Sequence, residues 1–173
     1  MKYPDLTNGE NIDTEWWQKA AQNTIRRYCG WHVAPNVYDT LTLDAHGGRS
    51  LMLPTQHVMS IDSVYLDDTI DLTGELDWSE SGYLRLRSKT FPDRPRCITV
   101  TLYHGYEPDE VPEVIMLMRS LARRARTQPL VSSQSVNGAS ASYLTAGGAP
   151  LSIPLLDIEK RMLDPYRIEW GVT

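Results

Sequence analysis

The sequence predicts an α+β fold, with a helical body, an inserted small antiparallel β lobe and a detached C-terminal helix. Apolar residues recur at helical spacing near both ends of the chain, whereas between residues 37 and 106 they alternate with the period of two that strands have. A polar stretch, residues 129–150, then separates the last helical pattern from the rest. We expect one domain over residues 1–173.

The first helix is expected over residues 12–30. Asp13 or Thr14 can accept hydrogen bonds from the unpaired N–H groups of a first turn, and Gly30 suits the left-handed position that ends a helix. The residues between them form one stripe at helical spacing, which consists of Trp17, Ala21, Thr24, Ile25 and Tyr28.

The β lobe is expected over residues 37–106. Alternating leucines on either side of Gly47 and Gly48 predict a hairpin that pairs residues 41–43 with residues 51–53. Residues 58–66 predict a further strand with a bulge near Ser60. The β-branched run of residues 97–103 predicts a central strand.

A long amphipathic helix is expected over residues 111–128, with Leu121 in the middle of its apolar face. Pro112 suits a first helical turn, because its missing N–H would be unpaired there. Arg119, Arg123 and Arg126 form a basic stripe on the other side, with Arg124 apart from them. This stripe is either a solvated or intersubunit face, or a face toward nucleic acid.

A last helix is expected over residues 152–164, after the polar stretch of residues 129–150. Glu159 falls in the middle of its apolar side, where an unpaired carboxylate would be costly to bury. We expect this helix to dock on a partner; the alternative is that it packs on its own chain, with Glu159 reaching Arg123. Its apolar side consists of Leu155, Leu156, Ile158, Met162 and Leu163.

The composition is that of a globular protein, with 41% hydrophobic and 23% charged residues and a net charge of −5 over 173 residues. This charge argues against a broad grip on DNA, which needs a cationic surface. No apolar run is long enough to cross a bilayer, so no membrane partner is expected. Cys29 and Cys97 are expected to be free buried thiols; the alternative is a single disulfide between them.

The sequence contains no catalytic constellation, and we expect no enzyme, no cofactor and no metal site. The four histidines are scattered, without ligand spacing. The serines of residues 138–142 lack the closing glycine of a nucleophile elbow. The acidic clusters at residues 67–68 and 77–80 could hold a cation or flank a sugar, but turn chemistry also explains them.

Several segments, taken in order, resemble the head-to-tail adaptor proteins of long-tailed bacteriophages. The resemblance covers most of residues 20–143 and a short closing segment, and it leaves out the N-terminal lead and the tail after Arg167. The segments that carry it are Tyr28-Cys29-Gly30-Trp31-His32-Val33-Ala34-Pro35, Leu41-Thr42-Leu43-Asp44, Gly47-Gly48, Leu51-Met52-Leu53-Pro54-Thr55, Ser60-Ile61-Asp62-Ser63-Val64, Ser81-Gly82-Tyr83-Leu84, His104-Gly105-Tyr106 and Leu163-Asp164-Pro165-Tyr166-Arg167.

The resemblance implies a structural virion protein in the neck, at the head–tail interface. It implies a ring, commonly a dodecamer, seated beneath the portal protein, with a stopper or tail-completion protein on its other side and DNA passing without sequence-specific binding. Arg119, Arg123 and Arg126 would then face a neighbouring subunit or the channel. The portal-docking residues would be Leu155, Leu156, Ile158, Glu159, Met162 and Leu163.

Two alternatives remain. The chain could instead be a neck stopper or tail-completion subunit. From another class, it could be a small carbohydrate-binding or hydrolytic domain that uses the acidic β lobe.

Overall fold

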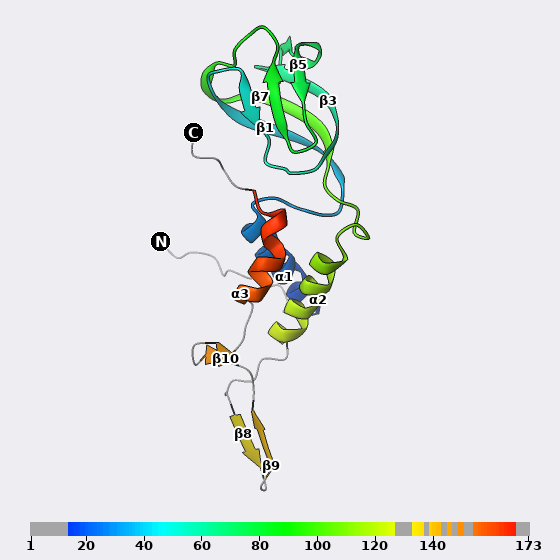
Figure 1. The fold of residues 1–173 in the computed structure, drawn as a ribbon, viewed down its shortest axis with the longest axis vertical. Coiled ribbons are helices and arrows are strands. Elements are labelled where there is room, and N and C mark those ends of the chain that lie inside the picture. The colour runs from blue at the N-terminus through cyan, green and yellow to red at the C-terminus, as the bar shows by residue number, and fades with distance from the viewer. Residues whose placement is uncertain are drawn as a thin grey trace, which may run out of the picture. The chain divides into compact units, whose positions relative to one another are not determined.

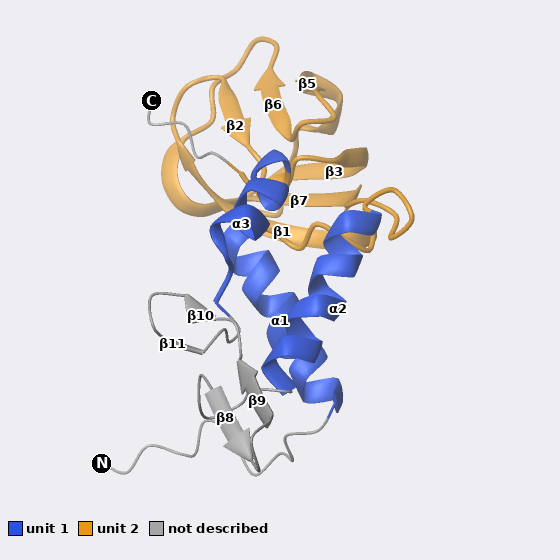
Figure 2. Ribbon diagram, turned by 60° about the horizontal axis from the view of Figure 1, so that its bottom comes forward, with its two compact units in different colours: residues 1–28, 112–165 blue, residues 29–111, 166–173 orange. Residues whose placement is uncertain are grey.

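The computed structural model describes residues 14–126 and 154–168, together with the backbone of four short strands between them. Two compact units divide the chain (Figure 1 and Figure 2): a helical unit, residues 1–28 and 112–165, and a β unit, residues 29–111 and 166–173. The mixed α+β class is confirmed, with helices and small antiparallel sheets in the described residues. None of the helices described has the length and apolar character needed to span a bilayer.

The helical unit contains α1 (Thr14–Cys29) and α2 (Pro112–Arg126). Both helices lie within the ranges expected from the sequence, and Val111 is buried just before α2 begins. Leu121 has none of its surface exposed, as its place on the apolar face predicts. Acidic residues stand in the first turn of each helix and arginines in the last, which complements the helix dipole.

The last helix is shorter than expected and is not detached. α3 spans Asp157–Leu163 and continues as a 3₁₀ turn, Asp164–Tyr166, so it begins five residues later than the expected start at residue 152. α3 packs against α2 within the helical unit, with Leu163 fully buried. The physical reason is that Glu159, which argued against packing on its own chain, has an arginine partner there.

The β unit contains two sheets around a shared core. One has the strand order β1-β7-β3-β4 and the other β2-β6-β5. The core is formed by leucines, valines and isoleucines from both sheets, among them Val64, Leu84, Ile98 and Leu102. The strands are β1 (Val37–His46), β2 (Ser50–Met52), β3 (Val58–Leu66), β4 (Ile70–Asp71), β5 (Leu76–Trp78), β6 (Tyr83–Leu86) and β7 (Asp93–His104), with a 3₁₀ turn at Thr73–Glu75.

The hairpin predicted across Gly47 and Gly48 is wrong. β1 pairs with β7, and β2 pairs with β6 in the other sheet. Both glycines have positive φ, 74° and 76°, and lead the chain from one sheet to the other. The Gly47 N–H donates to the carbonyl of Pro92, while the Phe91 N–H donates to the carbonyl of Gly48. The glycine pair therefore joins two sheets and does not close a two-stranded turn.

Two other predictions for this unit are confirmed. β7 lies between β1 and β3, the central place that its β-branched run predicts. The register between β3 and β7 shifts between Val58 and Ser60, where the bulge was expected.

The polar stretch of residues 129–150 falls outside the residues whose side chains the structure describes. Within it only backbone pairing is described: β8 with β9, and β10 with β11. These strands span Ser133–Val136, Ala139–Ser142, Thr145–Ala146 and Ala149–Pro150.

Candidate functional site

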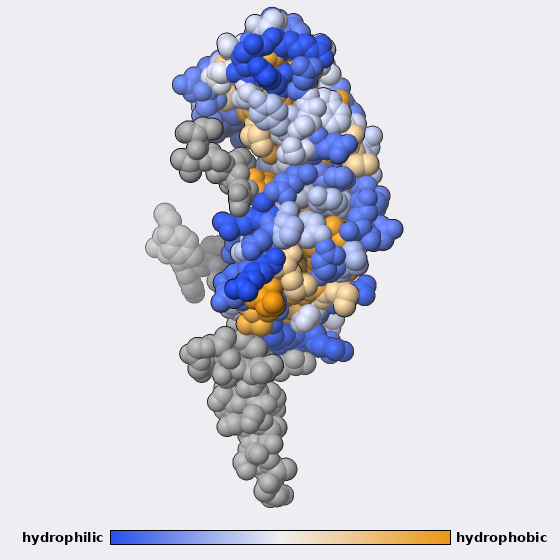
Figure 3. Space-filling view, in the orientation of Figure 1, coloured by the Kyte–Doolittle hydropathy of each residue, from blue (hydrophilic) through white to orange (hydrophobic). Residues whose placement is uncertain are grey.

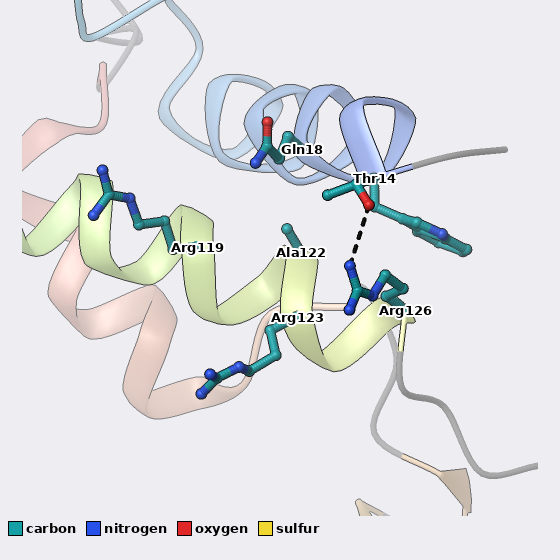
Figure 4. A pocket seen from close by; sticks show the side chains of 7 residues that line it. Thr14, Gln18, Arg119, Ala122, Arg123 and Arg126 are labelled. Atoms are coloured by element: carbon teal, nitrogen blue, oxygen red, sulfur yellow. Dashed lines mark hydrogen bonds between the residues drawn. The ribbon is translucent and has the colours of Figure 1, made fainter.

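The predicted arginine stripe lies beside a hollow between α1 and α2. The hollow has a volume of about 170 Å³, and Figure 4 shows the side chains around it. We call it the arginine hollow. It is lined by Thr14, Trp17, Gln18, Arg119, Ala122, Arg123 and Arg126.

Three of the residues that line the arginine hollow are cationic, Arg119, Arg123 and Arg126. The Nη1 of Arg126 donates a hydrogen bond to the Thr14 hydroxyl over 3.1 Å, which fixes that guanidinium against α1 (Figure 4). Arg119 is exposed and makes no ion pair within the described ranges 14–126 and 154–168. Guanidinium groups match carboxylates and phosphates with two parallel N–H donors. Trp17 adds an apolar wall. The structure thus brings together the three arginines that the sequence grouped, and adds Trp17, Thr14 and Gln18 to them.

The charge around this hollow differs from that of the whole protein. In the described residues of the helical unit, nine Lys and Arg oppose five Asp and Glu, a net charge of +4. In those of the β unit, seven basic residues oppose thirteen acidic ones, a net charge of −6. The overall charge of −5 therefore conceals a cationic helical unit.

Arg124, which the sequence set apart from the stripe, has a different role. It holds Glu159 in a two-point ion pair: Nη1 lies 2.8 Å from Oε1, and Nη2 lies 3.1 Å from Oε2. Oε2 also accepts the backbone N–H of Leu156 over 2.8 Å, and Nη2 also donates to the carbonyl of Pro154. The alternative in which the helix packs on its own chain is therefore confirmed, but with Arg124 and not Arg123 as the partner of Glu159.

The residues predicted to dock on the portal divide into two groups. Glu159 and Leu163 are buried and serve the packing of the helical unit. Leu155 and Leu156 are half-buried. Ile158 is 63% exposed and Met162 is 43% exposed, one turn apart on the same helix. The surface visible in Figure 3 is mostly hydrophilic with smaller hydrophobic areas.

The segment that contains His32 and the segment that contains His104 are far apart in the sequence but lie in contact inside the β unit. The rings of His32 and His104 lie 4.5 Å apart, although 71 residues separate them along the chain. A Cβ placed on Gly105 would lie 2.4 Å from the Nε2 of His32, so only glycine fits there. The histidines expected to be scattered are therefore a contact pair.

The same cluster holds the chain that follows α3. The Trp31 indole N–H donates to the carbonyl of Tyr166 over 2.7 Å, and the Ile168 N–H donates to the carbonyl of Cys29. His57 stacks on Tyr106 with ring centres 4.2 Å apart. Three of the segments that carry the adaptor resemblance, those with Trp31, His104 and Tyr166, thus contribute to one cluster of contacts in the β unit, the structural node.

His104 is the most perturbed titratable group of this node. Burial lowers its pKa to about 4, and the neighbouring His32 adds to the effect, while Asp39 partly opposes it. Neither ring nitrogen of His104 has a hydrogen-bond partner among the described residues. A neutral imidazole is therefore the form that the folded protein holds at neutral pH.

The acidic clusters of the β lobe are engaged in turns and surface pairs. Asp67 pairs with Arg94 at 2.6 Å, and Asp77 pairs with Arg87 at 2.8 Å. Asp71 accepts hydrogen bonds from Thr73, which lower its pKa. Within the part of the chain that the structure describes, no group of three or more His, Cys, Asp or Glu is placed to hold a metal ion.

The comparisons with known proteins bear on the fold. A chain from the neck of an empty GTA particle, whose structure was computed with C6 symmetry, superposes with a TM-score of 0.51. The match covers 95% of this chain and 84% of that one. Sequence identity is 13%, so the likeness concerns the fold. No protein-family model and no curated protein matches the sequence.

Proposed function

We propose that the chain is a ring-forming head-to-tail adaptor that binds beneath the portal of a phage-like particle and extends its DNA channel toward the tail. The observation that carries this proposal is the fold shared with a neck protein over nearly the whole chain. The role is structural and not enzymatic, and its place is the virion neck. The sixfold symmetry of the matched neck is compatible with a dodecamer, because twelve copies can obey it.

The surface chemistry supports a ring around DNA. Neighbours in a ring contact each other through two different faces, so one subunit must carry complementary surfaces. A cationic helical unit and an anionic β unit provide such a pair. An overall negative charge lets DNA pass without a tight, sequence-specific grip. The partners are further copies of the chain, the portal protein, and a stopper or tail-completion protein.

The exposed part of α3 is the proposed portal-docking surface. Glu159 and Leu163 hold α3 on the helical unit, which leaves Ile158 and Met162 to contact a partner. Removing α3 would expose the apolar surface around Leu163 and would unfold the unit, so truncation cannot test docking. Substitution of the exposed Ile158 and Met162 can test docking, because it leaves the buried side of α3 intact.

The test uses the variant Ile158→Asp/Met162→Asp. It should keep the melting temperature of the wild type, because both side chains are exposed, and it should lose binding to the portal protein. Met116→Asp is the matched control, since Met116 is an exposed apolar residue on α2. Portal binding by the double variant at wild-type strength would contradict this docking surface. Electron microscopy of the particle would separate an adaptor, which touches the portal, from a stopper, which does not.

A further inference from the structure

Among the described residues of the β unit, the carboxylates that form no ion pair are most densely grouped in one segment. Around the sheets, Asp67, Glu75 and Asp77 each have a basic partner. The segment Glu107–Glu110, which we call the acidic turn, has three carboxylates in four residues. None of the three makes an ion pair within the described ranges 14–126 and 154–168. The strongest uncompensated negative charge of the β unit is therefore concentrated there.

The acidic turn is held in shape by its own hydrogen bonds. The Glu110 N–H donates to the carbonyl of Glu107 over 3.0 Å, and the Glu107 N–H donates to the Glu110 carboxylate over 2.7 Å. Asn36 donates to the other carboxylate, that of Glu107, over 2.7 Å. Pro108 restricts the backbone further. Asp109 is exposed and has no such bond in the described ranges. A preorganised turn with one uncommitted carboxylate loses little conformational freedom on binding.

The arginine hollow is the matching surface. It presents Arg119 without an ion pair in the described residues, and it belongs to the helical unit, whereas the acidic turn belongs to the β unit. We propose that the arginine hollow of one copy binds the acidic turn of the neighbouring copy, with Asp109 opposite Arg119. This contact rests on the proposed ring, in which every copy offers its hollow to one neighbour and its turn to the other.

The size of the hollow favours a carboxylate over DNA. A volume of about 170 Å³, with Trp17 and Ala122 in its lining, suits one or two acidic side chains. A DNA duplex needs a broad row of cations, because each phosphate contact contributes separately and the charges are spread along the helix. The negative charge of the whole chain adds repulsion toward DNA. The acidic turn of a second copy supplies such carboxylates, so the occupant in this proposal is a second copy of this chain.

A charge swap tests the contact. Arg119→Glu and Asp109→Arg should each weaken ring assembly in the presence of portal protein by more than about tenfold, because each places like charges together. The double variant Arg119→Glu/Asp109→Arg should regain most of the assembly, since every interface again pairs opposite charges. Arg27→Glu and Glu80→Arg are the matched controls; both residues are exposed and lie outside the hollow and the turn.

Native mass spectrometry of the assembled species measures each variant, and circular dichroism checks its fold. Single variants that assemble like the wild type, or a double variant that fails to recover, would overturn this contact and leave the proposed function standing. An Arg119→Glu variant that forms normal rings but binds double-stranded DNA more weakly would assign the hollow to nucleic acid and also overturn it. A wild-type chain that stays monomeric with portal protein would contradict the ring itself.

Discussion

The described residues of the helical unit carry a net charge of +4, and those of the β unit carry −6. The two units also place their ion pairs differently. The pairs of Asp67, Glu75 and Asp77 in the β unit lie at its surface, with side chains more than a third exposed. The helical unit has exposed pairs as well, Glu15 with Lys19 and Asp157 with Lys160, but its pair of Arg124 and Glu159 has side-chain exposures of only 19% and 9%.

This difference shows which charges hold the fold and which remain for partners. Surface pairs contribute little to stability, because water screens them and long side chains lose freedom. A buried pair matters when one member is removed, since the other is left without compensation. The helical unit thus uses one arginine internally and leaves Arg119 outward, where assembly can use it. Substitutions at buried and exposed positions of the two units can test this difference.

Leu121→Ala should destabilise the helical unit most. The side chain is fully buried in α2, so its loss leaves a cavity and should lower the free energy of unfolding by about 2–5 kcal/mol. Met116→Ala on the same helix is the control, because that side chain is 70% exposed and should change stability by less than about 0.5 kcal/mol. Denaturant unfolding measures both. A loss below about 1 kcal/mol for Leu121→Ala would show that the core of the helical unit is misassigned.

Glu159→Gln should be the next largest change. The amide keeps the size of the side chain but leaves the Arg124 guanidinium without its counter-charge, which should cost about 3 kcal/mol. Asp157→Asn is the control on the same helix, since the pair of Asp157 with Lys160 is exposed and should contribute less than about 0.5 kcal/mol. Equal stability losses in the two variants, measured by chemical denaturation, would mean that the buried pair does not hold α3.

The β unit should lose stability in acid through His104. Its folded pKa of about 4 lies below the ordinary value of 6.5, so the unfolded chain binds the proton more readily. Stability is therefore full above pH 6.5, falls as the pH drops toward 4, and loses up to about 3 kcal/mol. His104→Asn should flatten this dependence, whereas His46→Asn, at the exposed end of β1 in the same unit, should not. Unfolding curves at pH 7, 5 and 4 give the slope, and an unchanged slope in His104→Asn would refute the assignment.

Asp77→Asn should have the smallest effect. Its pair with Arg87 lies at the surface, with side chains 63% and 59% exposed, so the change in unfolding free energy should stay below about 1 kcal/mol. Thermal melts at low and high salt should differ more for the wild type than for the variant. A loss as large as that of Glu159→Gln would remove the contrast between the two units.

Local patterns predicted the features that depend on local sequence. The helical spacing around Leu121 identified a buried face, and the β-branched run of residues 97–103 identified the central strand. The slip at Ser60 identified a register shift. Each signal depends on side chains that are close in sequence and share one face of one element.

The misses all depend on contacts between distant segments. Spacing places Arg124 outside the stripe but cannot show that it pairs with α3, so the alternative in which the helix packs on its own chain names Arg123 as the partner of Glu159, where the structure has Arg124. Gly47 and Gly48 mark a turn, yet nothing local says which strand β1 pairs with. His32 and His104 meet only because the fold places the chain before β1 beside the end of β7. The arginine stripe was visible, whereas Trp17, which walls the hollow, appeared only as part of a helix face.

The mass of the species formed with portal protein tests the central claim most directly. The wild-type chain, mixed with portal protein and examined by native mass spectrometry, should add a closed ring of its copies, twelve in the proposed adaptor, to the mass of the portal alone. A mass equal to that of the portal alone, with the chain left as a monomer, would contradict the account.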